Sequence, residues 1–286
     1  MTLRIGTRGS ALARAQTDLV VRALGLDVDV RVVRTTGDAS DRPIPELGDG
    51  VFVTAIEDAL RRGEIDVAVH SLKDLPTEDR PGLAIAAVPA REDPRDVLVT
   101  RTRGGLGTLV QGAVVGTSSP RRDAFLRALR PDVVTRPIRG NVDTRMAKVR
   151  SGECDATILA LAGLRRLGIA VEPAEILDPI DHPPAPGQGA LAVQCRADDD
   201  AAQRALRALD HPPTRRAVEA ERELLRLLGA SCEIPLGAYG RVEQGRVVLD
   251  AALPSEGGML RAHASGSDPL AVARECANAL EVGVRA

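Results

Sequence analysis

Arginine and hydroxyl side chains gather where one predicted strand leads into a predicted helix. Ser119 is expected to cap this helix, and Pro120 fits its first position. Arg121 and Arg122 then lie in the first turn, beside free backbone amides and the positive end of the helix dipole. Helix starts of this kind bind anions. Together with the Thr117 hydroxyl, we interpret the turn as part of a receptor for carboxylates.

Two further helix starts carry arginines in the same way. Arg139 and Arg145 flank a helix start at Asn141. Near the N-terminus, Arg8 stands beside Ser10, which is expected to cap the first helix. From residue 121 to residue 150 nine basic residues face three acidic ones, a net charge of +6 in a chain whose formal net charge is -2. The alternative, solvated surface arginines, stays open at this point.

Composition limits the kind of anion. Of the 38 basic residues only Lys73 and Lys148 are lysines, so the abundance of arginine by itself means little. Placement at strand-to-helix turns is more informative, because a guanidinium group binds a carboxylate or phosphate through two parallel hydrogen bonds. Nucleic-acid binding needs stacking rings or a broadly basic face, and the chain has no Trp, one Tyr and two Phe. A small polycarboxylate or phosphate is therefore favoured over nucleic acid.

A polar turn follows the near-continuous apolar strand predicted over residues 65–69. In an open α/β sheet, ligands bind beyond the carboxyl ends of the strands, and Lys73 and Asp74 stand at such an end. Lys73 gains weight because the chain otherwise uses arginine. For Asp74 the pattern leaves two roles open, a turn or capping aspartate and a catalytic carboxylate.

The four cysteines are far apart and form no C-x-x-C pair. This spacing predicts no disulfide framework and no metal site, and it suits a reducing cytosol. Cys154 and Cys195 lie in or beside predicted core strands and Cys276 lies within a helix, so each is expected to be a small hydrophobic residue. Cys232 lies on a loop among small residues. It is either equally inert or a nucleophile or attachment point.

The order of predicted elements indicates an α/β protein of two or three domains. At 286 residues the chain exceeds the usual single-domain size. Breaker-rich segments at 89–94 and 182–189 predict two crossovers between two hinged lobes with a cleft between them. No signal peptide or membrane-spanning run is recognised, so a cytoplasmic protein without membrane contact is expected. The expected domains are 1–90 with 187–207, 91–186, and a small α+β domain with an antiparallel sheet over 212–286.

Hydrophobic periodicity and breakers place the individual elements. Strands are expected at 3–7, 28–34, 65–69, 83–88, 97–100, 113–116, 133–138, 156–159, 190–195, 236–242, 247–253 and 260–264. Helices are expected at 11–24, 51–62, 119–129, 141–150, 160–167, 214–228 and 269–280. The loop 35–50 is long for a compact domain, which indicates either disorder or a mobile lid over a site.

Taken together, these segments resemble the porphobilinogen deaminase (hydroxymethylbilane synthase) family. They fall in the expected order across nearly the whole chain. The matching segments are Thr7–Ser10 with Leu12, Ala13 and Gln16; His70–Asp74; Arg91–Asp96; Gly116–Ser119 with Arg121 and Arg122; Arg139–Val142 with Thr144 and Arg145; Leu161–Gly168; Gly187–Ala190; and Glu221 and Arg222 leading to Cys232 and Pro235.

This resemblance implies a monomeric transferase of porphyrin biosynthesis. In the family, four porphobilinogen molecules are joined head to tail with loss of ammonia to give hydroxymethylbilane, a linear tetrapyrrole. The chain is primed by a dipyrromethane cofactor held by a thioether to the cysteine that matches Cys232. The resemblance also implies two hinged, periplasmic-binding-protein-like lobes. Cofactor contacts would come from Cys232, Arg121, Arg122, Ser119, Thr117, Lys73 and Asp74, and substrate contacts from Arg8, Ser10, Arg139, Arg145, Arg166 and Gln188.

Asp74, assisted by Lys73, would carry catalysis in such an enzyme. Loss of ammonia leaves a cationic azafulvene, which a nearby carboxylate stabilises.

The chain departs from the family pattern at two positions: Asp49 lies where the family often has lysine, and Ala230 lies where glycine or serine is common. The alternative from another class is a two-lobed carboxylate- or oxyanion-binding solute receptor. The third domain, the Cys232 loop and the absence of a recognised export signal argue against it.

Overall fold

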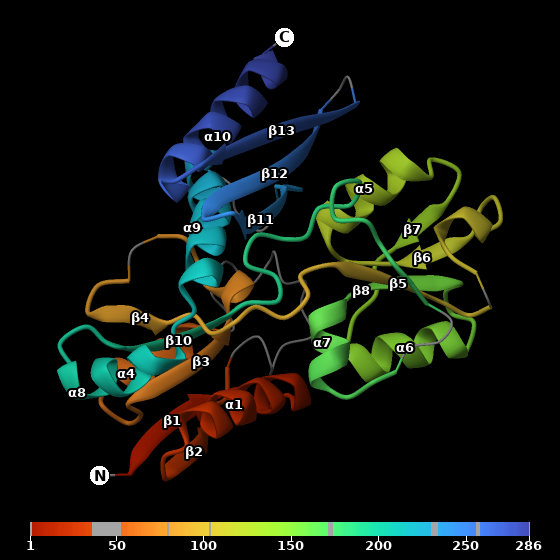
Figure 1. Cartoon of the computed structure of the whole chain (residues 1–286). Coiled ribbons are helices and arrows are strands. Elements are labelled where there is room, and N and C mark those ends of the chain that lie inside the picture. The colour runs from red at the N-terminus through yellow and green to blue at the C-terminus, as the bar shows by residue number, and fades with distance from the viewer. Residues whose placement is uncertain are drawn as a thin grey trace.

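The computed structural model contains three β-sheets, and each sheet is accompanied by its own helices (Figure 1). The structure describes residues 2–35, 53–78, 80–102, 104–170, 174–229, 234–255 and 258–285. Cys232, Asp49 and Ala230 lie outside these ranges, as does nearly all of the loop expected at 35–50. The expectations for these residues therefore remain predictions.

The first lobe contains a mixed sheet in the order β2-β1-β3-β10-β4. Its strands are β1 (Leu3–Thr7), β2 (Val28–Val32), β3 (Val67–Ser71), β4 (Leu83–Ala87) and β10 (Leu191–Arg196). Its helices are α1 (Ala11–Leu24), α4 (Thr54–Arg61) and α8 (Asp200–Leu206). β1 runs parallel to β2 and β3, whereas β10 runs antiparallel to both of its neighbours. Ile5, Val67 and Val193 are fully buried in its core.

The second lobe repeats this arrangement in the order β7-β6-β8-β5-β9. Its strands are β5 (Asp96–Thr100), β6 (Val114–Gly116), β7 (Val134–Arg136), β8 (Ala156–Ala160) and β9 (Ala174–Ile176), and its helices are α5 (Pro120–Leu129), α6 (Val142–Arg150) and α7 (Leu161–Arg166). β6 runs parallel to β7 and β8, and β5 runs antiparallel to β8 and β9. In each lobe the antiparallel inner strand follows a crossover of the chain, so the expected pair of α/β lobes is confirmed.

The third domain is a small antiparallel sheet with two helices, drawn from cyan (α9) to dark blue (α10) in Figure 1. Its strands are β11 (Gly237–Glu243), β12 (Arg246–Ser255) and β13 (Gly258–Gly266), and its helices are α9 (Pro212–Leu227) and α10 (Pro269–Arg285). Leu224, Leu249 and Leu280 are fully buried between helices and sheet. The expected α+β fold is confirmed. None of the helices in the described ranges has the length and apolarity that a membrane span requires.

Several elements differ from the sequence prediction. β3 begins at Val67 rather than at residue 65; just before it, the Asp66 carboxylate is bound by Arg4 and Arg196. β7 ends at Arg136, because Pro137 has no amide to continue the ladder. The edge strand β9 and helix α8 were not predicted, because both are short and lack an apolar run.

The three described cysteines have the inert roles expected of them. Cys154, Cys195 and Cys276 are all free and buried. Burial raises the pKa of the Cys195 thiol to about 11 and that of Cys276 to about 12. Both remain protonated near neutral pH, and a thiol is a poor nucleophile.

The two crossovers touch at Gly189, where the backbone has φ +83°. Its carbonyl accepts from the Glu92 amide at 3.2 Å, and a Cβ there would lie 2.4 Å from the Glu92 carbonyl oxygen. Gly189→Ala is therefore expected to destabilise the protein by about 3 kcal/mol, from left-handed strain together with backbone overlap. Gly25→Ala is the matched control, because Gly25 has φ +64° with nothing within 4 Å of the added Cβ. It should cost only about 1 kcal/mol. Equal losses in urea unfolding would contradict the overlap.

Candidate functional site

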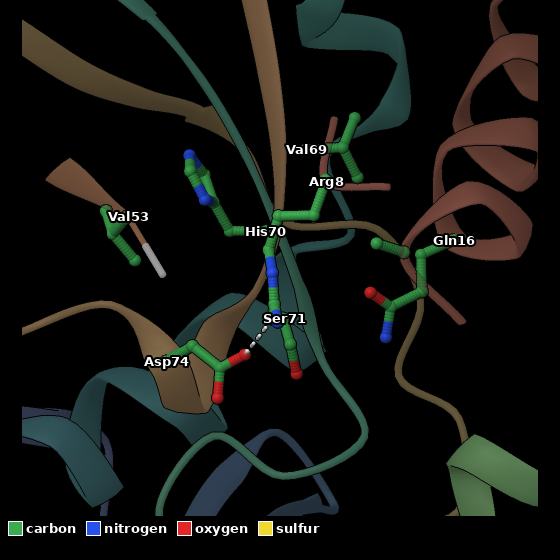
Figure 2. A pocket seen from close by; sticks show the side chains of 8 residues that line it. Arg8, Gln16, Val53, Val69, His70, Ser71 and Asp74 are labelled. Carbon is green, nitrogen blue, oxygen red and sulfur yellow. Dashed lines mark ion pairs between the residues drawn. The ribbon is translucent and has the colours of Figure 1, made fainter. Parts of the chain in front are cut away.

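A small pocket lies where β1 and β3 end. Because β1 and β3 are parallel neighbours, Arg8 and Asp74, which follow them, come to the same edge of the sheet. Arg8 Nη1 lies 3.9 Å from Asp74 Oδ2. Figure 2 shows the Arg8 side chain extending toward Asp74 past Ser71, with Gln16 on the opposite side. The pocket is lined by Arg8, Ala13, Gln16, Val53, Val69, His70, Ser71 and Asp74.

This pocket is small and open to solvent. Ser10 lies beside it as the cap of α1, since its Oγ accepts from the Ala13 amide at 3.2 Å. Arg8 therefore stands two residues before the capping residue of a helix, as the sequence predicts.

Lys73 connects this pocket to the second crossover. Its Nζ donates to Gln188 Oε1 at 3.2 Å. Gln188 is buried, and its Nε2 donates to the Pro94 carbonyl at 2.7 Å and to Asp96 Oδ1 at 2.9 Å. Desolvation by surrounding groups, and then the charge of Arg122, lower the pKa of Lys73 to about 8. The residue is nevertheless exposed to solvent. The side-chain amide of Gln188 therefore joins Lys73 of the first lobe to the Asp96 carboxylate of the second lobe.

Asp96 is the carboxylate on which Arg121 and Arg122 converge. Arg121 Nη2 donates to Oδ2 at 2.6 Å, and Arg122 Nη2 donates to Oδ1 at 2.7 Å. Arg122 Nε also donates to Oδ2 at 3.3 Å. Two backbone carbonyls accept from the other nitrogens, Pro183 from Arg121 Nη1 at 2.6 Å and Ile158 from Arg122 Nη1 at 2.9 Å. Burial disfavours the charged form of Asp96, but the two arginines outweigh it and hold its pKa well below the usual range.

Sequence reasoning missed this buried partner. Asp96 stood within the Arg91–Asp96 segment but without a role, because nothing local indicates which arginines reach it. His182 was missed as well: its ring lies 5.6 Å from that of Phe125, and its Nδ1 lies 3.4 Å from Asp96 Oδ2. Burial lowers the pKa of His182 to about 4 despite Asp96, so the imidazole is neutral near pH 7. The charge of the cluster comes from the arginines, Lys73 and Asp96.

The expected cap of α5 is present beside this cluster. Ser119 Oγ accepts from the Arg122 amide at 3.4 Å, and Thr117 Oγ1 accepts from the Ser119 amide at 3.2 Å. Arg121 Nε is buried and has no hydrogen-bond partner among the described residues. With Lys73, two guanidinium groups and one carboxylate, the cluster has more positive than negative charge.

Three more of the predicted arginines lie on the second lobe. Arg145 Nε donates to the Gly140 carbonyl at 2.8 Å, and burial together with the charges of Arg122 and Arg139 lowers its pKa. Arg166 Nη2 donates to the Gly189 carbonyl at 2.6 Å. Burial lowers the pKa of Arg166 to about 10, and its Nε has no partner in the described part of the chain. Arg139 is exposed. The charge of Arg122 therefore acts on Arg145, which belongs to the neighbouring helix start.

The third domain joins both crossovers through a buried ion pair. Arg91 Nη1 and Nη2 donate to Glu221 at 2.7 and 3.0 Å. Glu221, on α9, also accepts from the amides of Gly187 and Gly240, each at 2.6 Å. Arg91 Nε donates to the Gln188 carbonyl at 2.8 Å. Helix α9 is thereby held against the segment that carries Gln188. Within the described ranges no group of three His, Cys, Asp or Glu residues is placed to hold a metal ion.

Known proteins and family models match the sequence along nearly the whole chain. The family model described as "Porphobilinogen deaminase, dipyromethane cofactor binding domain" matches residues 3–204, and "Porphobilinogen deaminase, C-terminal domain" matches residues 215–285. Porphobilinogen deaminase of Acidothermus cellulolyticus is 52% identical over 265 residues, covering 90% of this chain and 80% of that protein. The Thermus thermophilus protein of the same name is 49% identical over 270 residues, covering 92% and 89%.

Among solved structures, the periplasmic VFT2 domain of BvgS from Bordetella pertussis aligns with a TM-score of 0.41 and 13% identity, covering 73% of this chain and 86% of that domain. The two family models together cover both lobes and the third domain. The two relatives, at 52% and 49% identity, align with 90% and 92% of the chain. The chain therefore belongs to the porphobilinogen deaminase family.

Proposed function

We propose that the chain joins four porphobilinogen molecules head to tail, releasing ammonia at each step, to give hydroxymethylbilane for tetrapyrrole biosynthesis. The observation that carries this proposal is the Asp74 carboxylate, 3.9 Å from Arg8 and next to Lys73, at the rim of a region with excess positive charge. Each porphobilinogen brings an acetate and a propionate, so an elongating chain needs several cations around it. A carboxylate and a guanidinium ~4 Å apart interact by roughly 4 kcal/mol at an effective dielectric of about 20.

The described residues fit a dipyrromethane cofactor with carboxylate side chains. The cluster around Asp96 has more positive than negative charge, and Arg121 Nε lacks an acceptor among the described residues. A buried donor without a partner costs free energy that a carboxylate oxygen would recover. When bound, dipyrromethane supplies the pyrrole end to which the first substrate is joined. The residues proposed to hold it are Cys232, Arg121, Arg122, Ser119, Thr117, Lys73 and Asp74.

Cys232 is proposed as the covalent attachment point. Helix α9 ends at Leu227, five residues before Cys232. Glu221 fixes this helix against the crossover that contains Gln188, which supports the proposal that the chain leading to Cys232 starts from an anchored helix. The three buried cysteines are unsuited to this role, since burial keeps their thiols protonated.

Asp74 is proposed to act on the substrate itself. When ammonia leaves the aminomethyl group of porphobilinogen, positive charge spreads over the ring and its nitrogen. A carboxylate beside that nitrogen stabilises the charge and accepts a proton when the new bond forms. Arg8, 3.9 Å away, supplies the opposite charge for a substrate carboxylate in the same pocket. The residues proposed to bind substrate are Arg8, Ser10, Arg139, Arg145, Arg166 and Gln188.

The three sheets are proposed to correspond to three domains at 1–90 with 187–207, 91–186, and 212–286.

Incubating the purified protein with porphobilinogen tests the function. We expect release of ammonia and a linear tetrapyrrole, together with intact masses that increase by successive pyrrole units. A solute receptor, the alternative kept from the sequence, would give neither. Failure to consume porphobilinogen would refute the proposal.

Lys73 gives the proposed site a specific pH dependence. Its pKa of about 8 means that the ammonium group is charged below pH 8 and neutral above it. Its attraction for substrate carboxylates is thus lost as pH rises through 8. KM for porphobilinogen is expected to rise about tenfold between pH 7 and pH 9.5, the equivalent of ~1.4 kcal/mol for one charge pair. In Lys73→Arg the guanidinium stays charged, so this part of the rise should disappear. Parallel pH profiles of KM would contradict the assignment.

A further inference from the structure

We infer that Arg222 is a positioning residue, which orients the turn carrying Lys73 and Asp74 from the helix that leads toward Cys232. The inference rests on the proposed function, because Asp74 has its catalytic role there. Arg222 belongs to α9 of the third domain, whereas the turn belongs to the first lobe. The contact between them is therefore a link between the proposed cofactor-bearing domain and the proposed catalytic carboxylate.

The turn depends on support from outside its own sequence. It is a 3-10 helix of three residues, Leu72–Asp74, closed by one backbone bond from the Leu75 amide to the Leu72 carbonyl at 3.2 Å. Short helices of this type leave carbonyls at their C-terminal end without partners inside the helix. Such carbonyls need donors from elsewhere if the turn is to keep one orientation.

Arg222 supplies those donors on both sides of Lys73 and Asp74. Nη1 donates to the Leu75 carbonyl at 2.8 Å and, more weakly, to the Leu72 carbonyl at 3.4 Å. Nη2 donates to the Pro76 carbonyl at 2.7 Å. The guanidinium is planar and its donors are fixed relative to one another, so three carbonyls on one group set the angle of the turn as well as its distance.

The helix that presents Arg222 is itself fixed. Glu221, the preceding residue, is fully buried and accepts from Arg91, Gly187 and Gly240. Leu224 lies in the core of the third domain. Consecutive side chains of α9 thus hold the second crossover and the turn of Lys73 and Asp74. The two attachments hold the second crossover and the turn next to each other, where Lys73 Nζ donates to Gln188 Oε1.

Apolar packing holds the turn against α9 independently of Arg222. Val218, one helical turn earlier, lies in the same buried cluster as Leu72 and Leu75. Removing the Arg222 guanidinium would therefore leave the turn docked but free to rotate about this contact. A misplacement of about 1 Å at a reacting group is enough to slow a reaction roughly a hundredfold. The expected consequence is a defect in turnover with the fold and the cofactor in place.

Arg216→Met is the matched control for Arg222→Met. Arg216 lies on the same helix and also donates to backbone carbonyls, Gly245 at 2.9 Å and Ser267 at 2.7 Å, but both acceptors belong to the third domain. Loss of Arg222 is expected to lower kcat about 10- to 100-fold, with KM changed less than about twofold and the Cys232 adduct retained. Arg222→Lys should recover part of kcat, while Arg216→Met should leave kcat unchanged.

Amide hydrogen exchange reports on the turn without relying on activity. Exchange of the Leu75 amide should be faster in Arg222→Met and in Arg222→Lys than in the wild type, and unchanged in Arg216→Met. Wild-type kcat in Arg222→Met, an equal loss in Arg216→Met, or unchanged exchange at Leu75 would each overturn the inference. Failure of the proposed function is distinguishable from these outcomes, because the wild-type protein would then carry no adduct and consume no porphobilinogen.

Discussion

Replacing Asp74 with asparagine is expected to abolish turnover of porphobilinogen while the cofactor stays attached. The amide keeps the shape of the side chain but removes the negative charge that offsets the cation left when ammonia departs. An opposite pair ~4 Å apart is worth roughly 4 kcal/mol at an effective dielectric of about 20, which is about a thousandfold in rate. Tetrapyrrole formation and intact mass measured on the same sample check both parts of the prediction.

Two variants control for the shape and location of the Asp74 carboxylate. Asp74→Glu keeps the charge but moves it by one methylene, so an intermediate rate is expected. Glu78→Gln removes an exposed carboxylate four residues further along (78 − 74 = 4), which is not among the residues lining the pocket, and should leave the rate unchanged. Normal turnover by Asp74→Asn would refute the catalytic role. Loss of the adduct as well would assign Asp74 to cofactor assembly instead.

Helix starts were predictable from the sequence because a cap acts over three or four residues. Ser10 and Ser119 cap α1 and α5 as expected, each accepting from an amide three residues ahead. Asn141 occupies the capping position of α6 but makes no side-chain bond there. Residue type thus located all three helix starts. It did not determine whether each cap is used, which depends on the loop leading into it.

The direction of the arginine side chains was not predictable. The sequence placed Arg121 and Arg122 in the first turn of α5, where they were expected to face an anion. The anion that they contact in the structure is Asp96, 25 and 26 residues earlier in the chain. Lys73 and Gln188 are 115 residues apart and still share a hydrogen bond. Such contacts follow from how the lobes pack, and no local pattern encodes them.

The polar residues of the site gather where the chain passes between the lobes. Asp96 begins the strand after the first crossover, and Gln188 lies in the second. Segments at a crossover are not part of either hydrophobic core, so buried polar side chains there must satisfy one another. The resulting cluster is polar, buried and shared by both lobes. A ligand with several carboxylates that bound beside this cluster would be attracted by Lys73 of the first lobe and by Arg121 and Arg122 of the second.

Replacing Cys232 with serine is expected to remove the covalent cofactor and with it the activity. A serine hydroxyl is far less nucleophilic than a thiolate and would not form the corresponding linkage under the same conditions. The intact mass should fall by the two pyrrole units of dipyrromethane in addition to the side-chain difference. The rate should fall at least about a thousandfold, since the growing chain would lose its anchor. Denaturing mass spectrometry separates a covalent adduct from one that is merely bound.

The buried Cys154 provides the matched control for the Cys232 prediction. Burial, with the nearby Glu153, raises the pKa of its thiol. Cys154→Ser should therefore keep the adduct mass, whatever it costs in stability through a buried hydroxyl. If Cys232→Ser retained the adduct while Cys154→Ser lost it, the attachment would lie on the second lobe. In that case the contacts of Glu221 and Arg222 with the first lobe and the crossovers would have no role in presenting the cofactor. If only Cys232→Ser lost the adduct, the cofactor would be attached just after α9, the helix whose Arg222 binds the turn that carries Asp74.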